Sequence, residues 1–384
     1  MSTEPRLSRR PVITGYGIVS HAGSGAAAAW GALSNGASGA RAWSPDEQDS
    51  TFRCAPVPDD YRPHARIPRN IAHFLDRGSA VALDAALQAV EMAGLESNSD
   101  SRRIAVADGL PYRAPGQATM FAPNGHLIAR VAGARGAAVI TGGAEASGMA
   151  AIVAGVRLIE QGDADAVVAG AAQTLQRPLL DHLVGAGFAT RNDAKPFDRT
   201  HDGLLPAEGA AYVTIEAEET ARERGATVLA RLTAYAESFD SSVEPLAVSE
   251  AAEAGRSQQD TLTRAGYLQG QVDLLVSCAD GRPAVDFAEG FGTMRTFGRH
   301  AFFAGVTTSA GALGQTLAAS GPVSLVAALM ALERQSSFPV AGLSDPEEGV
   351  ELAFVRQTRE ERLNCVMVTS MGLGGTLVSM LVER

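Results

Sequence analysis

An order of strand, small-residue turn and helix occurs twice in this chain, at a nearly constant separation. The apolar run "RRIAVADG" ends at Gly109, and the run "VDLLVSCADG" ends at Gly281, 172 residues later. The stretch "AAVITGGAEASG" carries Glu145 in a turn before a long apolar segment. The stretch "AGVTTSAGALGQ" carries Gln315 in a similar turn, 170 residues later. A pattern that returns at a fixed offset favours a duplicated α/β unit.

The apolar runs predict both strands and helices, in alternation. Because the predicted strands lack a polar residue at every second position, they are typical of a sheet that is buried on both faces. The predicted helices have apolar residues at helical spacing, and several end at glycine. We expect strands over 102–109, 138–141, 163–172, 210–219, 232–239 and 272–281, two strands within 364–383, and helices over 26–39, 79–95, 124–133, 146–160 and 248–265.

Composition limits the class of protein. With 384 residues, 46% apolar and 20% charged, the chain can form one large α/β domain or two packed halves. The net charge is −11 and no block of Lys or Arg forms a basic patch, which argues against nucleic acid as a partner. The cysteines are isolated, so no metal knuckle or disulfide framework is indicated. No apolar run reaches the length of a membrane span, and we expect a reducing cytoplasm and no membrane association.

Four segments point to a known family. They are "VITGYGIVSHAG" near the N-terminus, "GDADAVVAGAAQ", "KPFDRTHDGLLPAEGAAYVTIE" (Lys195–Glu216) and "SMGLGGT" (Ser370–Thr376). Together they resemble the β-ketoacyl synthases of the thiolase superfamily, the condensing enzymes of fatty acid and polyketide assembly. The resemblance covers nearly the whole chain.

The resemblance implies a fold and an assembly. We expect an α/β protein with the thiolase-like five-layer α-β-α-β-α sandwich, built from two similar halves over residues 1–235 and 236–384. Family members are dimers in which the central strand of the first half pairs across the interface. They use no cofactor and no metal, and we expect none for this chain.

The chain departs from the family at each catalytic position. The family uses a Cys nucleophile and two His residues that stabilise an enolate, whereas this chain carries Glu145, Asp280 and Gln315 there, and Ala310 replaces a lysine. Carboxylates make poor thioester nucleophiles, and a helix N-terminus would keep Glu145 ionised. A carboxylate at Asp280 would repel an enolate. We therefore expect no intact catalytic residue.

One subfamily has this property. In type II polyketide synthases, an active ketosynthase α subunit pairs with a homologous chain length factor, or ketosynthase β subunit, whose Cys is usually replaced by Gln. Its walls complete the tunnel for the growing chain. The resemblance therefore implies a heterodimer with a ketosynthase, served by an acyl carrier protein. It also implies that the turn with Leu373, Gly374 and Gly375 gates an acyl pocket. The segment between Gly109 and Asn124 is short for the family.

Several alternatives remain open. Glu145 could cap the following helix, pair with a cation across the dimer, or keep a role as acid or base. Arg282 could neutralise Asp280, and Ser147 most simply packs in the first helical turn. Besides a non-catalytic subunit, the chain could be a malonyl carrier protein decarboxylase used in priming. It could also be a homodimeric acyl-transfer enzyme that uses Glu145.

Overall fold

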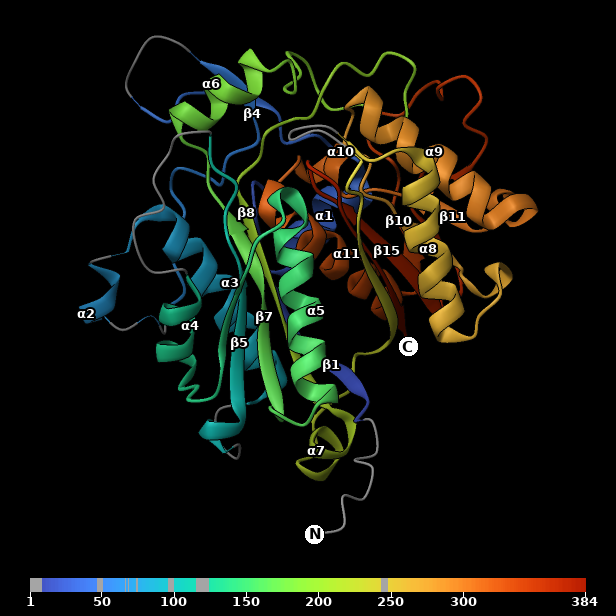
Figure 1. Ribbon diagram of the computed structural model, residues 1–384. Coiled ribbons are helices and arrows are strands. Elements are labelled where there is room, and N and C mark those ends of the chain that lie inside the picture. The colour runs from blue at the N-terminus through green and yellow to red at the C-terminus, as the bar shows by residue number, and fades with distance from the viewer. Residues whose placement is uncertain are drawn as a thin grey trace.

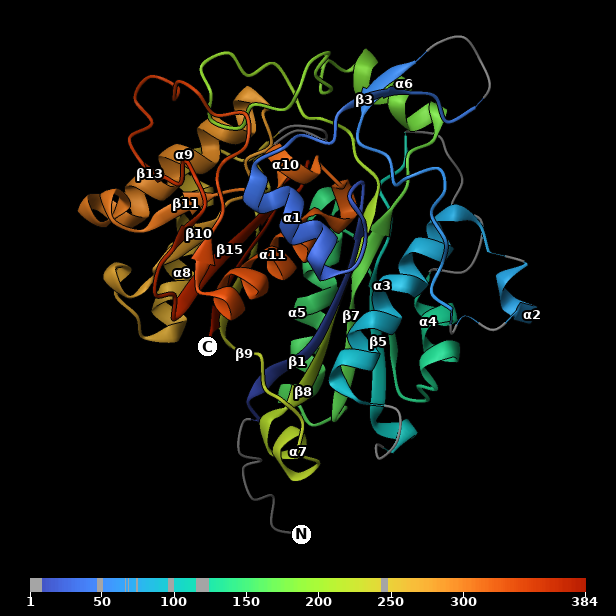
Figure 2. The same ribbon diagram turned by 180° about the vertical axis from the view of Figure 1, so that it is seen from behind.

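Helices and sheets alternate in five layers (Figures 1 and 2). The computed structural model describes residues 9–46, 51–65, 67, 69–73, 75–95, 100–114, 124–242 and 248–384. Two helices cover the outer face of each half and two lie in the middle layer. They are α3 (Arg77–Ala93) and α4 (Asn124–Ala132) outside the first half, α5 (Ser147–Glu160) and α11 (Ser320–Arg334) in the middle, and α8 (Ala251–Ala265) and α9 (Pro283–Phe297) outside the second half.

The two halves share one strand topology. In chain order, the first half has β1 (Pro11–Ser20), β5 (Ile104–Gly109), β6 (Ala138–Thr141), β7 (Ala166–Gln173) and β8 (Gly209–Ala217). The second half has β9 (Ala230–Phe239), β10 (Leu274–Val276), β11 (Gly305–Thr307), β15 (Cys365–Met371) and β16 (Thr376–Glu383). Across the sheet the orders are β1-β8-β7-β5-β6 and β9-β16-β15-β10-β11. The parallel and antiparallel pairings also correspond. The predicted duplication is therefore confirmed.

The halves are joined edge to edge. Strands β1 and β9 pair at Val12 with Arg231 and at Ile13 with Ala230, which gives one 12-stranded sheet. The division that the sequence analysis places between residues 235 and 236 falls inside β9, and the boundary stays a prediction.

Shorter elements connect these layers. They are β2 (Gly23–Ser24), α1 (Ala26–Asn35), β3 (Arg41–Trp43), β4 (Phe52–Cys54), α2 (Arg69–Ala72), η1 (Ser101–Arg103), η2 (Ala144–Ala146), α6 (Arg177–Gly185), α7 (Glu218–Glu223), η3 (Gln269–Gln271), η4 (Gly298–Phe302), α10 (Ala310–Leu313), η5 (Leu317–Ala319), β12 (Ser336–Ser337), β13 (Ala353–Phe354) and β14 (Arg359–Glu360). The short segment after Gly109 is described only to residue 114 and again from residue 124.

The middle layer holds the main core. Apolar residues of α5 and α11 pack with strands of both halves in one cluster. Gly148 permits the close approach of the two helices, since a Cβ there would lie 2.4 Å from the carbonyl oxygen of Ala318. The stretch Leu317–Arg334 is apolar enough to cross a membrane, but 83% of it is buried inside the protein. It is therefore a core helix.

The structural register of the repeat differs from the sequence-based one. Both central helices follow a 3-10 turn that starts at a non-glycine residue with positive φ, 51° at Ala144 and 44° at Leu317. These two residues are 173 positions apart, as are the helix starts at Ser147 and Ser320. The counterpart of Glu145 is therefore Ala318, and Gln315 lies three residues before it. The offset of 170 therefore joined two residues that are not structural counterparts.

The strand predicted over 272–281 ends early, because its later backbone donors bond to side chains. The N–H of Cys278 donates to Thr369 Oγ1, and those of Asp280 and Gly281 donate to Asp286 Oδ1. Each of these donors would otherwise serve a neighbouring strand. The sequence after Val276 therefore forms a loop, which frees Asp280 to face the interior.

A buried carboxyl group fixes the start of α4. Asp108 accepts hydrogen bonds from Tyr212 Oη at 2.6 Å and from the Gly125 N–H at 2.8 Å. Burial raises the pKa of Asp108 to about 6, although both hydrogen bonds act in the opposite direction. Stability from this group is therefore present below the ordinary Asp pKa and is lost as the pH rises through about 6.

We predict that Asp108→Asn removes this pH dependence. Relative to the wild type, the variant's free energy of unfolding should rise by about 2 kcal/mol between pH 4 and pH 7. Asparagine cannot ionise, so the cost of ionising the buried Asp108, whose pKa is raised to about 6, is absent from the variant. Denaturant unfolding of both proteins across this range measures the difference. Parallel pH profiles would contradict the prediction.

Candidate functional site

The turn after β6 brings Glu145 into the interior. Gly143 has φ 148°, which favours glycine, and Ala144 has φ 51°, a conformation that costs a non-glycine residue roughly 1–2 kcal/mol. The Glu145 side chain is buried, with 1% exposure. Its oxygens do not cap α5, whose first residues have no side-chain cap. They reach instead toward two segments of the second half.

A buried arginine connects Glu145 with Asp280. Arg282 Nη1 donates to Glu145 Oε1 at 3.1 Å, and Arg282 Nη2 donates to Asp280 Oδ2 at 2.8 Å. Nε and the backbone N–H of Arg282 also donate to Asp280. Burial lowers the pKa of Arg282, but the charges of Asp280 and Glu145 outweigh this effect and raise the pKa above its usual value. The guanidinium thus stays charged between two carboxylates.

Gln315 completes the same cluster. Its Nε2 donates to Asp280 Oδ2 at 2.7 Å, and its Oε1 accepts the N–H of Leu317 at 3.1 Å. Both ends of the amide are therefore used inside the protein. The fold brings together Glu145, Asp280 and Gln315, and Arg282 links the first two. We refer to these four residues as the Arg282 cluster.

The glycine-rich turn between β15 and β16 lies against Glu145. The N–H of Leu373 donates to Glu145 Oε2 at 2.8 Å. Gly372 is in close contact with the first half, since a Cβ there would lie 2.2 Å from the carbonyl oxygen of Gly143. Gly374 and Gly375 have φ of 82° and 103°, which explains their residue type without any ligand. Acyl binding by this turn stays a prediction.

Aromatic side chains cover the cluster on the side of the first half. The Phe188 ring lies 5.8 Å from the Arg282 guanidinium, a cation–π distance. Phe188 packs edge-on against His182, which stacks on Tyr112. Burial, and then the charge of Glu145, raise the pKa of Tyr112. These rings keep solvent away from the ion pairs and strengthen them.

Asp286 organises the loop that carries Asp280. This buried carboxylate accepts the N–H groups of Phe197, Asp280 and Gly281, and it lies 2.8 Å from His201 Nδ1. Burial lowers the pKa of His201, but the hydrogen bond and charge of Asp286 outweigh it, so the pKa is raised. Sequence reasoning missed Asp286 and Phe188. A carboxylate in the apolar first turn of α9 was the available signal for Asp286.

Neither of the nearby thiol and hydroxyl groups is an activated nucleophile. Ser147 Oγ donates to the carbonyl oxygens of Leu110 and Ala144, so it packs in the turn. Burial, and then the charge of Glu289, raise the pKa of Cys278 well above its usual value, which leaves it a thiol. No histidine in the described part of the chain hydrogen-bonds to the Arg282 cluster. The described residues also contain no group of three or more His, Cys, Asp or Glu side chains that could hold a metal ion.

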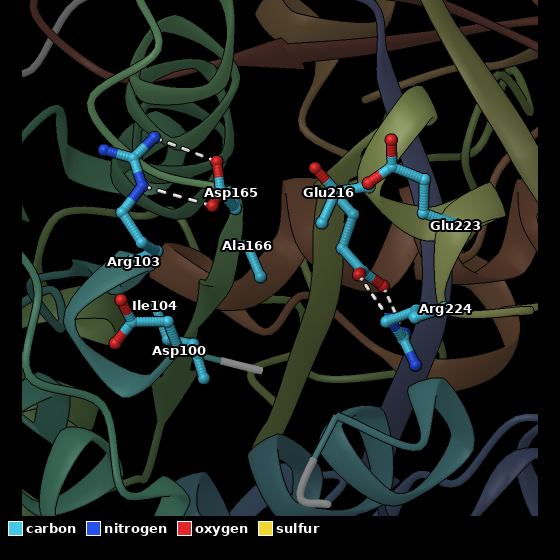
Figure 3. A pocket seen from close by; sticks show the side chains of 9 residues that line it. Asp100, Arg103, Ile104, Asp165, Ala166, Glu216, Glu223 and Arg224 are labelled. Atoms are coloured by element: carbon cyan, nitrogen blue, oxygen red, sulfur yellow. Dashed lines mark hydrogen bonds and ion pairs between the residues drawn. The ribbon is translucent and has the colours of Figure 1, made fainter. Parts of the chain in front are cut away.

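One cavity lies far from this cluster, and one groove lies beside it. A polar cavity of about 480 Å³ lies at the opposite ends of the strands (Figure 3), where Arg103 pairs with Asp165 and Arg224 pairs with Glu216. An apolar groove of about 580 Å³ is lined by Pro283, the residue after Arg282, and by Phe287. Ligand sites in α/β sheets lie at the carboxyl ends of strands, which favours the region of the Arg282 cluster over the polar cavity.

Comparison with known proteins gives consistent matches. Residues 8–221 match the family described as "Beta-ketoacyl synthase, N-terminal domain", and residues 229–344 match "Beta-ketoacyl synthase, C-terminal domain". The 3-oxoacyl-[acyl-carrier-protein] synthase 2 of Coxiella burnetii is 29% identical, over 98% of this chain and 99% of the relative.

Two solved structures share the fold. "The ishigamide ketosynthase/chain length factor" superposes with a TM-score of 0.88 at 23% identity, covering 98% of this chain and 100% of that chain. A type II polyketide synthase ketosynthase in complex with its acyl-carrier protein superposes with a TM-score of 0.86 at 21% identity, with the same coverage. The thiolase-like fold expected from the sequence is confirmed.

We predict that Arg282→Met lowers the free energy of unfolding by about 3–5 kcal/mol, because it leaves two buried carboxylates without a cation. Denaturant unfolding measures the loss. Arg157→Met, which removes an exposed pair with Glu237, is the control and should cost less than about 1 kcal/mol. The triple variant Glu145→Gln/Asp280→Asn/Arg282→Met should recover most of the loss. A triple variant as unstable as Arg282→Met would contradict the electrostatic explanation.

Proposed function

Because this chain belongs to the β-ketoacyl synthase family, we propose that it is a non-catalytic subunit that pairs with an active ketosynthase. In this role it is a chain length factor of type II polyketide biosynthesis. Its surface completes the tunnel that accepts the growing chain, while its partner performs the condensation. The proposal places both subunits in the cytoplasm, with an acyl carrier protein that delivers the substrates.

The Arg282 cluster is the observation that carries the proposal. Each of the three positions that should be catalytic contributes a side chain to it, and each is already engaged by another part of the chain. A nucleophile must present a free electron pair to an acyl carbon. Glu145 instead gives one oxygen to Arg282 and the other to the Leu373 N–H.

Electrostatics also opposes decarboxylation by this chain. Loss of carbon dioxide from a malonyl group leaves an enolate, which needs preorganised donors. Asp280 contributes an acceptor, and the Gln315 amide donor is directed at that carboxylate. This argument weakens the alternative of a malonyl carrier protein decarboxylase used in priming.

Strand β6 supports pairing with a second subunit, although it is the edge strand of the first half and not the central strand expected from the resemblance. It is an edge of the 12-stranded sheet, and Ala138 at its start is exposed while Val139 to Thr141 are half-buried. Val106 N–H and Leu110 N–H donate to the carbonyl oxygens of Ala137 and Thr141, so alternate groups face β5. The backbone groups of Ala138 and Ile140 therefore face the open edge. An apolar open edge suits a strand from a partner.

The remaining alternative is a homodimeric acyl-transfer enzyme in which Glu145 acts as acid or base. Both carboxylate oxygens of Glu145 already accept hydrogen bonds, one from Arg282 and the other from the Leu373 N–H. This alternative requires Glu145 to separate from Arg282 when a substrate binds. It predicts that this chain, without a partner, turns over acyl or malonyl carrier protein, whereas the main proposal predicts no turnover.

The first test is co-expression with a candidate ketosynthase α subunit from the same organism. We expect a 1:1 complex by size-exclusion chromatography with mass detection. We also expect turnover of malonyl carrier protein by the complex and none by this chain alone, since its nucleophile is absent. A homodimer that turns over acyl or malonyl carrier protein, and loses this activity in Glu145→Ala, would refute the proposal.

A second prediction concerns the β6 edge. Ala138→Pro removes one outward N–H and leaves the bonds to β5 in place, so it should abolish the 1:1 complex. Ala138→Val keeps the N–H and should leave the complex intact. Analytical ultracentrifugation of the co-expressed pairs measures both. A complex that survives Ala138→Pro would exclude strand pairing through this edge.

A further inference from the structure

The glycine-rich turn has few bonds that would fix it by itself. Within the turn, Gly375 N–H donates to Gly372 O at a long 3.3 Å, and Gly372 N–H donates to Thr376 O at its base. Gly374 has no atom within 4 Å of an ideal Cβ position. Glycines in this arrangement allow several backbone conformations. From outside the turn, the Asp240 N–H donates to the carbonyl oxygen of Gly375 at 2.8 Å, at the C-terminal side of the turn. The tip at Leu373 therefore depends on a further contact.

Glu145 supplies the contact at the tip. Leu373 N–H donates to Glu145 Oε2 at 2.8 Å, and the Leu373 side chain is 9% exposed. This bond joins the second half of the chain to η2 in the first half. A hydrogen bond to a buried carboxylate is stronger than one between neutral groups.

The carboxylate that accepts this bond is itself held in place. Its second oxygen binds Arg282, which is fixed by several bonds to Asp280, and Asp280 is fixed by Gln315. Each side chain in this series is held by a hydrogen bond or an ion pair to the next one. The series starts at Gln315, between α10 and η5, and ends at the backbone of Leu373.

We infer that the Arg282 cluster is a tether that holds the Leu373 turn closed on Glu145, so that this chain admits no acyl chain beneath the turn. Glu145 is a positioning residue in this scheme and makes no bond to substrate. The inference rests on the proposed non-catalytic function and gives it a physical mechanism. A carrier-bound acyl chain that meets a closed turn in this subunit can enter only through the partner ketosynthase.

Hydrogen–deuterium exchange on the full chain, alone or in its complex, tests the tether. In Glu145→Ala, amides of the peptide over 371–376 should exchange roughly ten- to hundredfold faster, the range expected for loss of a hydrogen bond to a charged group. Glu145→Gln keeps one acceptor oxygen and should give an intermediate rate. Ser320→Ala is the matched control, because Ser320 Oγ donates to the backbone carbonyl of Glu145 and not to its carboxylate.

The outcomes separate a tether from a general loss of stability. Faster exchange confined to this turn, with the peptides of α5 and α11 unchanged, supports the inference. Unchanged exchange in Glu145→Ala overturns it, and so does acceleration spread evenly over the chain or equal acceleration in Ser320→Ala. This readout requires no activity. If the complex formed by Glu145→Ala assembles and is active, and the turn exchanges at the wild-type rate, the tether is refuted. The proposed function is not affected by that result.

Discussion

A buried guanidinium between two carboxylates is the interaction on which this site depends. Arg282 takes one carboxylate from the first half of the chain and one from the second. Removing such charges from water costs several kcal/mol for each ion, and only close geometry and full hydrogen bonding offset that cost. Gln315 and the Leu373 N–H supply the donors that the guanidinium cannot. The substituted positions are therefore coupled, since a change at one leaves a buried charge at another.

The duplicated fold explains why these residues meet. Each half carries a parallel edge of three strands, and the loops after β6, β10 and β11 meet at one end of the middle layer, in the Arg282 cluster. The middle helices begin at that end, after turns with a strained residue at Ala144 and at Leu317. Such turns at the carboxyl ends of strands are where α/β proteins usually carry their chemistry. In this chain the same turns bring oppositely charged side chains into contact. Arg282 pairs with Glu145 and Asp280, and these ion pairs join the two halves.

Under the proposed function, the position of Glu145 serves the protein's own charges and not a substrate. A side chain presented by a strained turn can attack a substrate if it is a nucleophile with a base beside it. Glu145 occupies such a turn but is matched to Arg282, and the rings of Phe188 and its neighbours restrict the access of water. A preorganised environment is thus retained, but it stabilises the protein's own charges. Under the proposed function, this retention explains why the family scaffold extends over nearly the whole chain although the chain carries no catalytic group of its own.

The sequence by itself determined the layers and the duplication, and it singled out Glu145, Asp280 and Gln315, which the structure brings together. Apolar runs without alternation require a sheet that is covered on both faces, and the glycine-rich segments mark turns that tolerate few other residues. The sequence even marked Arg282 as a neutraliser of Asp280, because the two are neighbours in the chain. Tertiary structure alone decided that the same guanidinium reaches Glu145, 137 residues away, and that Glu145 holds the turn at Leu373. Contacts between distant segments depend on how the two halves dock, and no local pattern of residues encodes that distance.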